Sequence, residues 1–112
     1  MIPEQLDLIT PLVDLRPASP RLTIGQRFAQ FHKANPSVYR NLVILTRRAY
    51  VAGRRRIGIR QLWEVLRWEY SLATVGDAYK LNDHFTMHYA RLIMATVPEL
   101  KDMFETRKQR AA

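Results

Sequence analysis

The sequence predicts an all-α fold, a compact bundle of four to five helices in a single domain. Apolar residues recur at spacings of three and four in several segments, which is the periodicity of amphipathic helices. Capping residues, glycine or proline separate these segments, where helices begin and end. The length of 112 residues and the hydrophobic content of 47% are typical of one globular domain.

The first 22 residues are predicted to form an arm, and residues 23–112 to form the helical domain. The arm contains four of the six prolines, which exclude a long helix or a central strand. Its aliphatic content is too high for a free tail, so we expect it to dock on its own domain or on a partner. The aliphatic residues are Ile2, Leu6, Leu8, Ile9, Leu12, Val13 and Leu15.

The first helix begins at a capping box. Thr23 and Gln26 have the spacing at which each side chain satisfies a backbone N–H group at a helix start. The short helix that follows places Phe28 and Phe31 on one side. It ends at residues 35–36, an Asn-Pro pair, because proline disfavours helix in the residue before it.

The second helix is expected to span about residues 36–52, with Asn35 as its N-terminal cap and Pro36 in its first turn. Gly53 ends it. The residues expected to be buried are Val38, Leu42, Leu45, Ala49 and Ala52.

The third helix spans residues 59–73. The stretch before it, RRRIGIR, predicts either a small strand, which would give a minor hairpin, or the lead into this helix. The inner side consists of Ile59, Leu62, Trp63, Leu66, Tyr70 and Ala73, and the other side of Arg60, Glu64, Arg67, Trp68 and Ser71. We expect the arm or a neighbouring helix to cover Trp68; the alternative is an exposed, partner-binding tryptophan.

The fourth helix begins after a turn at residues 76–77, with Asn82 or Asp83 as its cap. Its inner side is predicted to be Phe85, Thr86, Tyr89, Leu92, Ile93 and Thr96. Its outer side is predicted to be His84, Met87, Arg91 and Met94, with His88 at the border. Pro98 ends the helix, and the remaining residues predict a short terminal helix or strand with a basic tail.

The positive charge of the chain is concentrated in one segment. The net charge is +8, and eleven bases without a single acid lie between Leu15 and Trp63, whereas residues 1–14 carry −3. Arginine, the better bidentate partner for phosphate, outnumbers lysine by fourteen to four. This pattern indicates a surface that faces a polyanion; the alternative is a charge that serves only solubility.

Nucleic acid, and duplex DNA in particular, is therefore the predicted partner. Spacings of seven bring Arg40, Arg47 and Arg54 close to one line along a helix, and neighbouring arginines extend the charge past its end. The predicted phosphate-binding residues are Arg40, Arg47, Arg48, Arg54, Arg55, Arg56 and Arg60. The predicted base-reading residues are Asn82, His84, Met87, His88 and Arg91. The third and fourth helices resemble a helix-turn-helix pair, and their long connection favours a winged-helix-like or divergent variant.

Several chemistries are excluded or unsupported. The chain has no cysteine, and its four scattered glycines form no phosphate-binding loop. His84 and His88 have a zinc-ligand spacing, but Phe85 stands where metalloproteases have glutamate. We expect no enzymatic activity, metal or cofactor. The longest aliphatic run, residues 42–45, is far too short for a membrane span, and no signal peptide is evident, so we expect a cytoplasmic protein.

Three stretches of the chain resemble a small, uncharacterised family of helical proteins encoded by phages and prophages. These stretches are FHKANPSVYRNLVILTRRAYVAG, RIGIRQLWEVLRWEY and YKLNDHFTMHYARLIMATVPELKDMFETR. The resemblance implies a location in a bacterial host cell and a DNA-binding role in regulation or genome handling. The resemblance alternatively implies that the protein is an inhibitor that binds a host defence or replication protein. Asp83 stands where family members often have a second asparagine. A homodimer that packs through Met87 and Met94 is compatible with either role.

Overall fold

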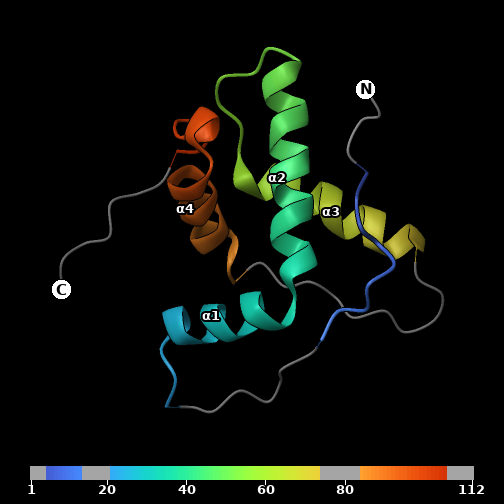
Figure 1. Cartoon of the computed structure of the whole chain (residues 1–112), viewed down its shortest axis with the longest axis vertical. Helices are drawn as coiled ribbons and strands as arrows, with labels where there is room; N and C mark the ends of the chain where they lie inside the picture. The colour runs from blue at the N-terminus through green and yellow to red at the C-terminus, as the bar shows by residue number, and fades with distance from the viewer. Residues whose placement is uncertain (1–4, 14–20, 74–83, 106–112) are drawn as a thin grey trace.

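The computed structural model describes residues 5–13, 21–73 and 84–105. The described chain forms the helices α1 (Ile24–Ala34), α2 (Pro36–Val51), α3 (Ile59–Ala73) and α4 (Thr86–Thr96), followed by the 3₁₀ helix η1 (Pro98–Leu100) (Figure 1). The predicted all-α fold is confirmed. No strand occurs in these residues, so neither the minor hairpin nor a β-wing is found there. The connection between α3 and α4 that bears on the helix-turn-helix prediction lies largely outside them.

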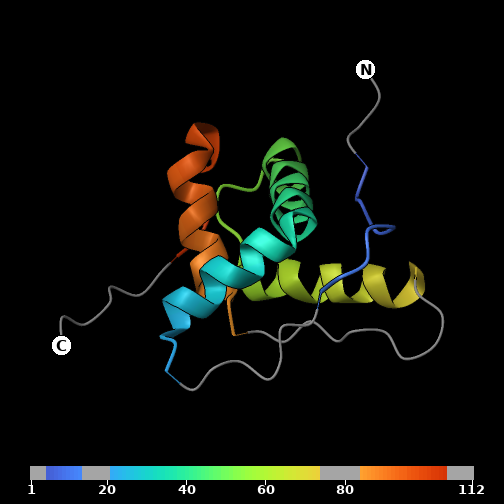
Figure 2. The same ribbon diagram turned by 60° about the horizontal axis from the view of Figure 1, so that its bottom comes forward.

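Helix α2 is the centre of the bundle, because it contacts α1, α3, α4 and η1. α2 and α4 lie side by side, and α3 crosses them (Figures 1 and 2). The largest fully buried side chains include Leu42 of α2, Trp63 and Leu66 of α3, and Tyr89 and Ile93 of α4. The core therefore lies where these three helices meet, and burial of this apolar area supplies the main stabilisation of the fold.

The predicted helix start at Thr23 is confirmed. The N–H of Gln26 donates to the hydroxyl of Thr23 at 3.1 Å, and the N–H of Thr23 donates to the side chain of Gln26 at 2.9 Å. Two of the N–H groups that a helix start leaves without a helical acceptor are thus satisfied, which fixes the first turn of α1.

The predicted stop at Gly53 is also confirmed. Gly53 has φ +96°, a conformation that side chains with a Cβ rarely adopt. The N–H of Gly53 donates to the carbonyl of Tyr50 and the N–H of Arg54 to that of Ala49, both at 3.0 Å. This is a Schellman motif, and it turns the chain out of the helix. The stretch RRRIGIR therefore forms no strand and leads into α3. A 2.9 Å hydrogen bond from the N–H of Ile57 to the carbonyl of Met103 holds it in place.

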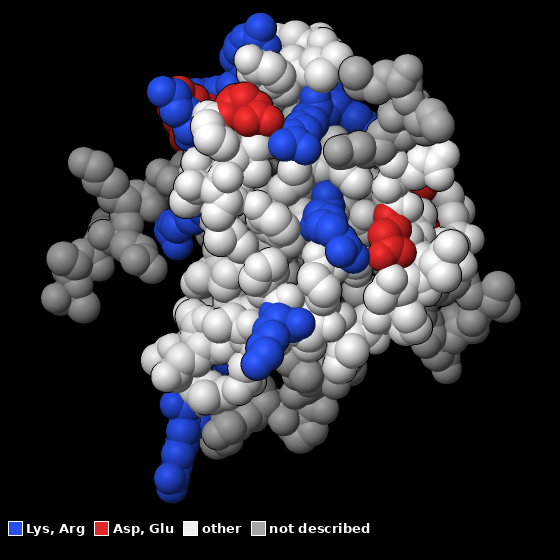
Figure 3. All heavy atoms as spheres, viewed as in Figure 1, with Lys and Arg blue, Asp and Glu red and all other residues white. Residues whose placement is uncertain are grey.

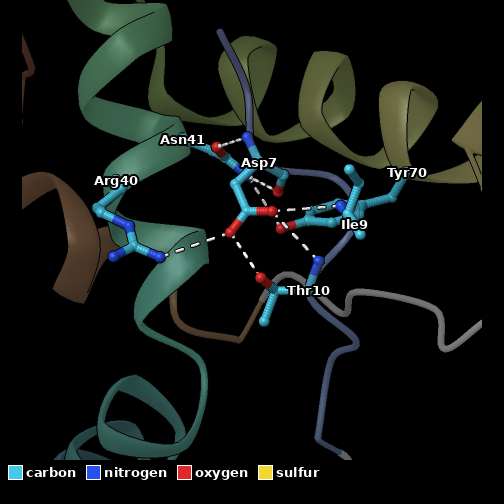
Figure 4. A network of polar contacts seen from close by, with 6 residues as sticks. All are labelled: Asp7, Ile9, Thr10, Arg40, Asn41 and Tyr70. Atoms are coloured by element: carbon cyan, nitrogen blue, oxygen red, sulfur yellow. Dashed lines mark hydrogen bonds and ion pairs between the residues drawn. The ribbon is translucent and has the colours of Figure 1, made fainter. Parts of the chain in front are cut away.

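The described part of the arm, residues 5–13, docks on its own domain, which confirms the first alternative for it. Leu6, Leu8 and Leu12 pack against the core. The Asn41 side chain accepts from the N–H of Asp7 at 2.7 Å and donates to the carbonyl of Asp7 at 2.8 Å (Figure 4). It also donates to the hydroxyl of Tyr70 at 3.0 Å, and so connects the arm, α2 and α3.

Asn35 holds the arm in the same way. It accepts from the N–H of Val13 at 2.6 Å and donates to the carbonyl of Val13 at 3.1 Å. Asn35 stands at the N-cap position of α2, as predicted, but its side chain makes no capping hydrogen bond. That part of the prediction is wrong, because the backbone groups of Val13 occupy the amide instead.

On α3 the inner side is as predicted from Ile59 to Tyr70, and the described residues do not provide the expected cover of Trp68. Trp68 is 62% exposed. The described part of the arm reaches α3 at Tyr70, which is buried on the opposite side of the helix, so residues 5–13 do not cover Trp68. Three residues predicted to be inward, Ala52, Ala73 and Thr96, are exposed at the ends of their helices.

Helix α4 begins at Thr86, later than predicted, and Asn82 and Asp83 lie outside the described residues. Thr86, Tyr89 and Ile93 are buried as expected, together with Ala90. The prediction that Met87 and Met94 point away from the core is wrong, because both are partly buried against it. Helix α4 has neighbours on several sides, so more than one strip of its surface is covered. The predicted dimer through these methionines loses its basis.

Candidate nucleic-acid interface

Two arginines of α2, Arg40 and Arg47, lie on one face, and carboxylates from other segments pair with them. Arg40 and Arg47 are seven residues apart on α2, close to one line and about 10 Å apart along the axis. Arg40 pairs with Asp7 of the arm at 3.5 Å, and Arg47 with Glu99 of η1 at 3.2 Å. In Figure 3, basic side chains run down the face that α2 crosses, and acidic side chains lie beside some of them.

Arg54 was predicted to continue this row but lies beyond the end of α2. The chain turns at Gly53, and Arg54, Arg55 and Arg56 follow in a segment that we call the arginine loop, residues 53–58. Arg56 pairs with Glu105 at 3.4 Å. The predicted row is therefore a helical pair of arginines followed by a loop.

Arg54 and Arg55 are exposed and form no ion pair with any described carboxylate. Arg55 donates to the carbonyl of Tyr50 at 3.3 Å, and its guanidinium lies 4.8 Å from the centre of the Tyr50 ring. The Schellman motif fixes one end of the loop, and the hydrogen bond of Ile57 fixes the other. The loop thus presents two arginines with hydrogen-bond donors available to an anion, on a backbone that needs little ordering when it binds.

Two further predicted phosphate-binding residues lie at the surface. Arg48 is exposed on α2, and Arg60 is exposed in the first turn of α3. No described carboxylate pairs with Arg60. These residues flank the arginine loop in sequence on both sides and add to its positive potential.

The predicted base-reading residues do not form an exposed strip. His84 is exposed in the turn before α4, whereas Met87 packs against the core. The ring of His88 lies 5.1 Å from the ring of Phe28 of α1. Burial lowers the pKa of His88, and the positive charge of Arg91 lowers this pKa further. His88 is therefore less readily protonated than a free histidine and is a poor source of positive charge for a phosphate.

The carboxylate of Asp7 is held in place by its own segment. It accepts from the Thr10 hydroxyl at 2.7 Å and from the N–H groups of Ile9 and Thr10, both at 3.2 Å (Figure 4). The hydrogen bonds from Thr10 are the main cause of a lowered pKa of Asp7, and Arg40 adds a smaller effect. Asp7 is thus ionised and aimed at Arg40. Sequence reasoning missed this residue, and also Glu99 and Glu105.

The described residues contain no group of three or more potential metal ligands. None of the described helices has the length and apolar character needed to cross a bilayer.

No match emerges when the chain is compared with protein-family models, curated proteins and solved structures. The geometry and charge of the site therefore provide the main basis for inferring function.

Proposed function

We propose that the protein binds nucleic acid, with duplex DNA as the first candidate, through the arginine loop and the arginine face of α2. The observation that carries the proposal is the pair Arg54 and Arg55, exposed on an anchored backbone and without a carboxylate partner in the described chain. Guanidinium groups bind phosphate oxygens in a bidentate manner, and a row of them can follow a phosphate backbone.

The binding is proposed to be of the phosphate-backbone type. Contacts to phosphate position a protein on a duplex but carry no sequence information. Because Met87 and His88 pack against other side chains, α4 is left out of the proposed contact. From the sequence resemblance to phage-encoded helical proteins alone, we further propose a role in genome handling or regulation inside a bacterial host.

The salt dependence of DNA binding tests this proposal. If about six phosphates are neutralised, affinity for a duplex should fall about a thousandfold between roughly 50 and 200 mM salt, because each contact releases condensed counterions. Fluorescence anisotropy with duplexes of two unrelated sequences is the measurement, and both duplexes should give similar values. The proposal is abandoned if no binding occurs at the lowest salt, or if affinity does not change with salt.

A second candidate function is binding of a host protein through the outer side of α3. Val65, Trp68 and Leu72 recur at spacings of three and four on this side, and all three are exposed. A tryptophan with an aliphatic neighbour on each side is typical of the centre of a protein interface. This face is separate from the arginine pair of α2, so the two functions are compatible.

Substitution of Trp68 tests the second candidate. Trp68→Glu should abolish capture of a partner from a nuclease-treated bacterial lysate, since a charge would be buried in the interface. Val51→Glu is the matched control, because Val51 is an exposed apolar residue at the end of α2. Equal capture by wild type, Trp68→Glu and Val51→Glu would remove this candidate. If the partner is a second copy of the chain, sedimentation of the purified protein would identify it.

A further inference from the structure

Three arginines of the candidate interface each form an ion pair with a carboxylate from a segment distant in sequence. Asp7 reaches Arg40 from the arm, Glu99 reaches Arg47 from η1, and Glu105 reaches Arg56 from the segment after η1. The partners are separated by 33, 52 and 49 residues. The terminal parts of the described chain thus bring acids to the one segment that has none of its own.

We propose that these carboxylates are built-in competitors of the nucleic acid and occupy three positions that phosphates take in the complex. The proposal rests on the proposed function and assigns a regulation to that site. A carboxylate and a phosphate present similar oxygen acceptors to a guanidinium, and the two cannot occupy the same donors together. The protein therefore exists in a self-paired state, which nucleic acid must open.

The geometry of Asp7 supports this role more strongly than an accidental surface pair would. The amide of Asn41, which is next to Arg40 in the chain, holds the backbone of Asp7 through two hydrogen bonds. Thr10 and Ile9 orient the carboxylate (Figure 4). Neither set of bonds involves Arg40, so the competing charge is positioned independently of the pair it forms.

The pairs are also weak enough to be exchanged. All six side chains are at least 31% exposed, and Glu105 is 86% exposed. Exposed ion pairs contribute little to stability because water and salt screen them. A polymer that offers many phosphates at once can replace all three carboxylates, whereas a single phosphate competes with one of them at a time. The arrangement consequently favours a polyanion over small phosphate compounds.

Neutralising the three acids tests the proposal. Asp7→Asn, Glu99→Gln and Glu105→Gln should each raise affinity for a duplex of about 20 base pairs by about two- to fivefold at about 100 mM salt, and the triple variant by tenfold or more. Asp7→Asn retains an oxygen that accepts from Ile9 and Thr10, so the arm should stay docked. Circular dichroism checks that each variant is folded.

Asp102→Asn is the matched control. Asp102 is exposed between Glu99 and Glu105, forms no ion pair with a described residue, and its neutralisation changes the net charge by the same amount. A smaller gain for Asp102→Asn than for the three variants supports competition, whereas an equal gain overturns it in favour of a general charge effect. If the wild type binds and the triple variant binds equally well, this inference fails and the proposed function stands. If neither protein binds even at the lowest salt, both proposals fail; if the triple variant binds at about 100 mM salt and the wild type binds only at lower salt, both are supported.

Discussion

Charge reversal of the arginine loop, Arg54→Glu with Arg55→Glu, is expected to lower affinity for duplex DNA about a hundredfold at low salt. Each arginine offers charge-assisted hydrogen bonds to phosphate, and each glutamate would repel the backbone. The slope of log affinity against log salt should become shallower by about two, one for each lost phosphate contact. Anisotropy titrations of both proteins at several salt concentrations provide the two quantities.

A control with the same change in net charge separates a local contact from long-range attraction. Lys33→Glu with Arg67→Glu also changes the charge by −4, and both residues lie outside the proposed surface: Lys33 in the last turn of α1 and Arg67 on α3, where it pairs with Glu64. This control should lose only a few-fold in affinity. Equal losses in the two double variants would mean that DNA senses the total charge, and the arginine loop would then have no special role.

The features that the sequence predicted well are those decided within a few residues. Thr23 and Gln26 satisfy each other's backbone N–H groups over a single turn. Gly53 is needed because the chain adopts a positive φ there, and no distant residue changes this requirement. Apart from Ala52 and Ala73 at the helix ends, the residues predicted for the core faces of α2 and α3 follow in the same way from apolar spacing.

The features that the sequence could not predict depend on partners from distant segments. Asn35 looks like a helix cap because caps are local, yet the docked arm supplies better-placed backbone groups from Val13. The arginine segment looked uniformly positive because the nearest acids in sequence are not the nearest in space. The faces of α4 were misjudged because periodicity finds one buried strip, whereas this helix packs against several neighbours.

One element of the site was partly predictable. The aliphatic content of the arm required that it dock somewhere, and residues 5–13 do so on the same domain. The place of docking was not predictable, because it depends on two asparagine amides that each bind one arm residue through both backbone groups. An asparagine on the buried side of a helix, as Asn41 is, was the available signal, since a buried amide requires several hydrogen-bond partners.

Asn41→Ala is expected to lower the free energy of unfolding by about 3 kcal/mol, because it removes three hydrogen bonds and takes away the side-chain partner of the partly buried N–H and carbonyl groups of Asp7. Chemical denaturation gives this value. In a chain that lacks residues 1–13, the same substitution should cost only about 1 kcal/mol, since the bond to Tyr70 alone is then lost. Equal costs in the two backgrounds would contradict the role of Asn41 in holding the arm.

The same substitution links stability to binding, with opposite signs. When Asn41 no longer holds the backbone of Asp7, the carboxylate is no longer fixed next to Arg40, and this arginine becomes available to a phosphate. Asn41→Ala should therefore bind duplex DNA about two- to fivefold more tightly than the wild type while being less stable. General loss of structure would weaken both properties together. A parallel decrease of affinity and stability would show that the arm supports the interface rather than competing for it.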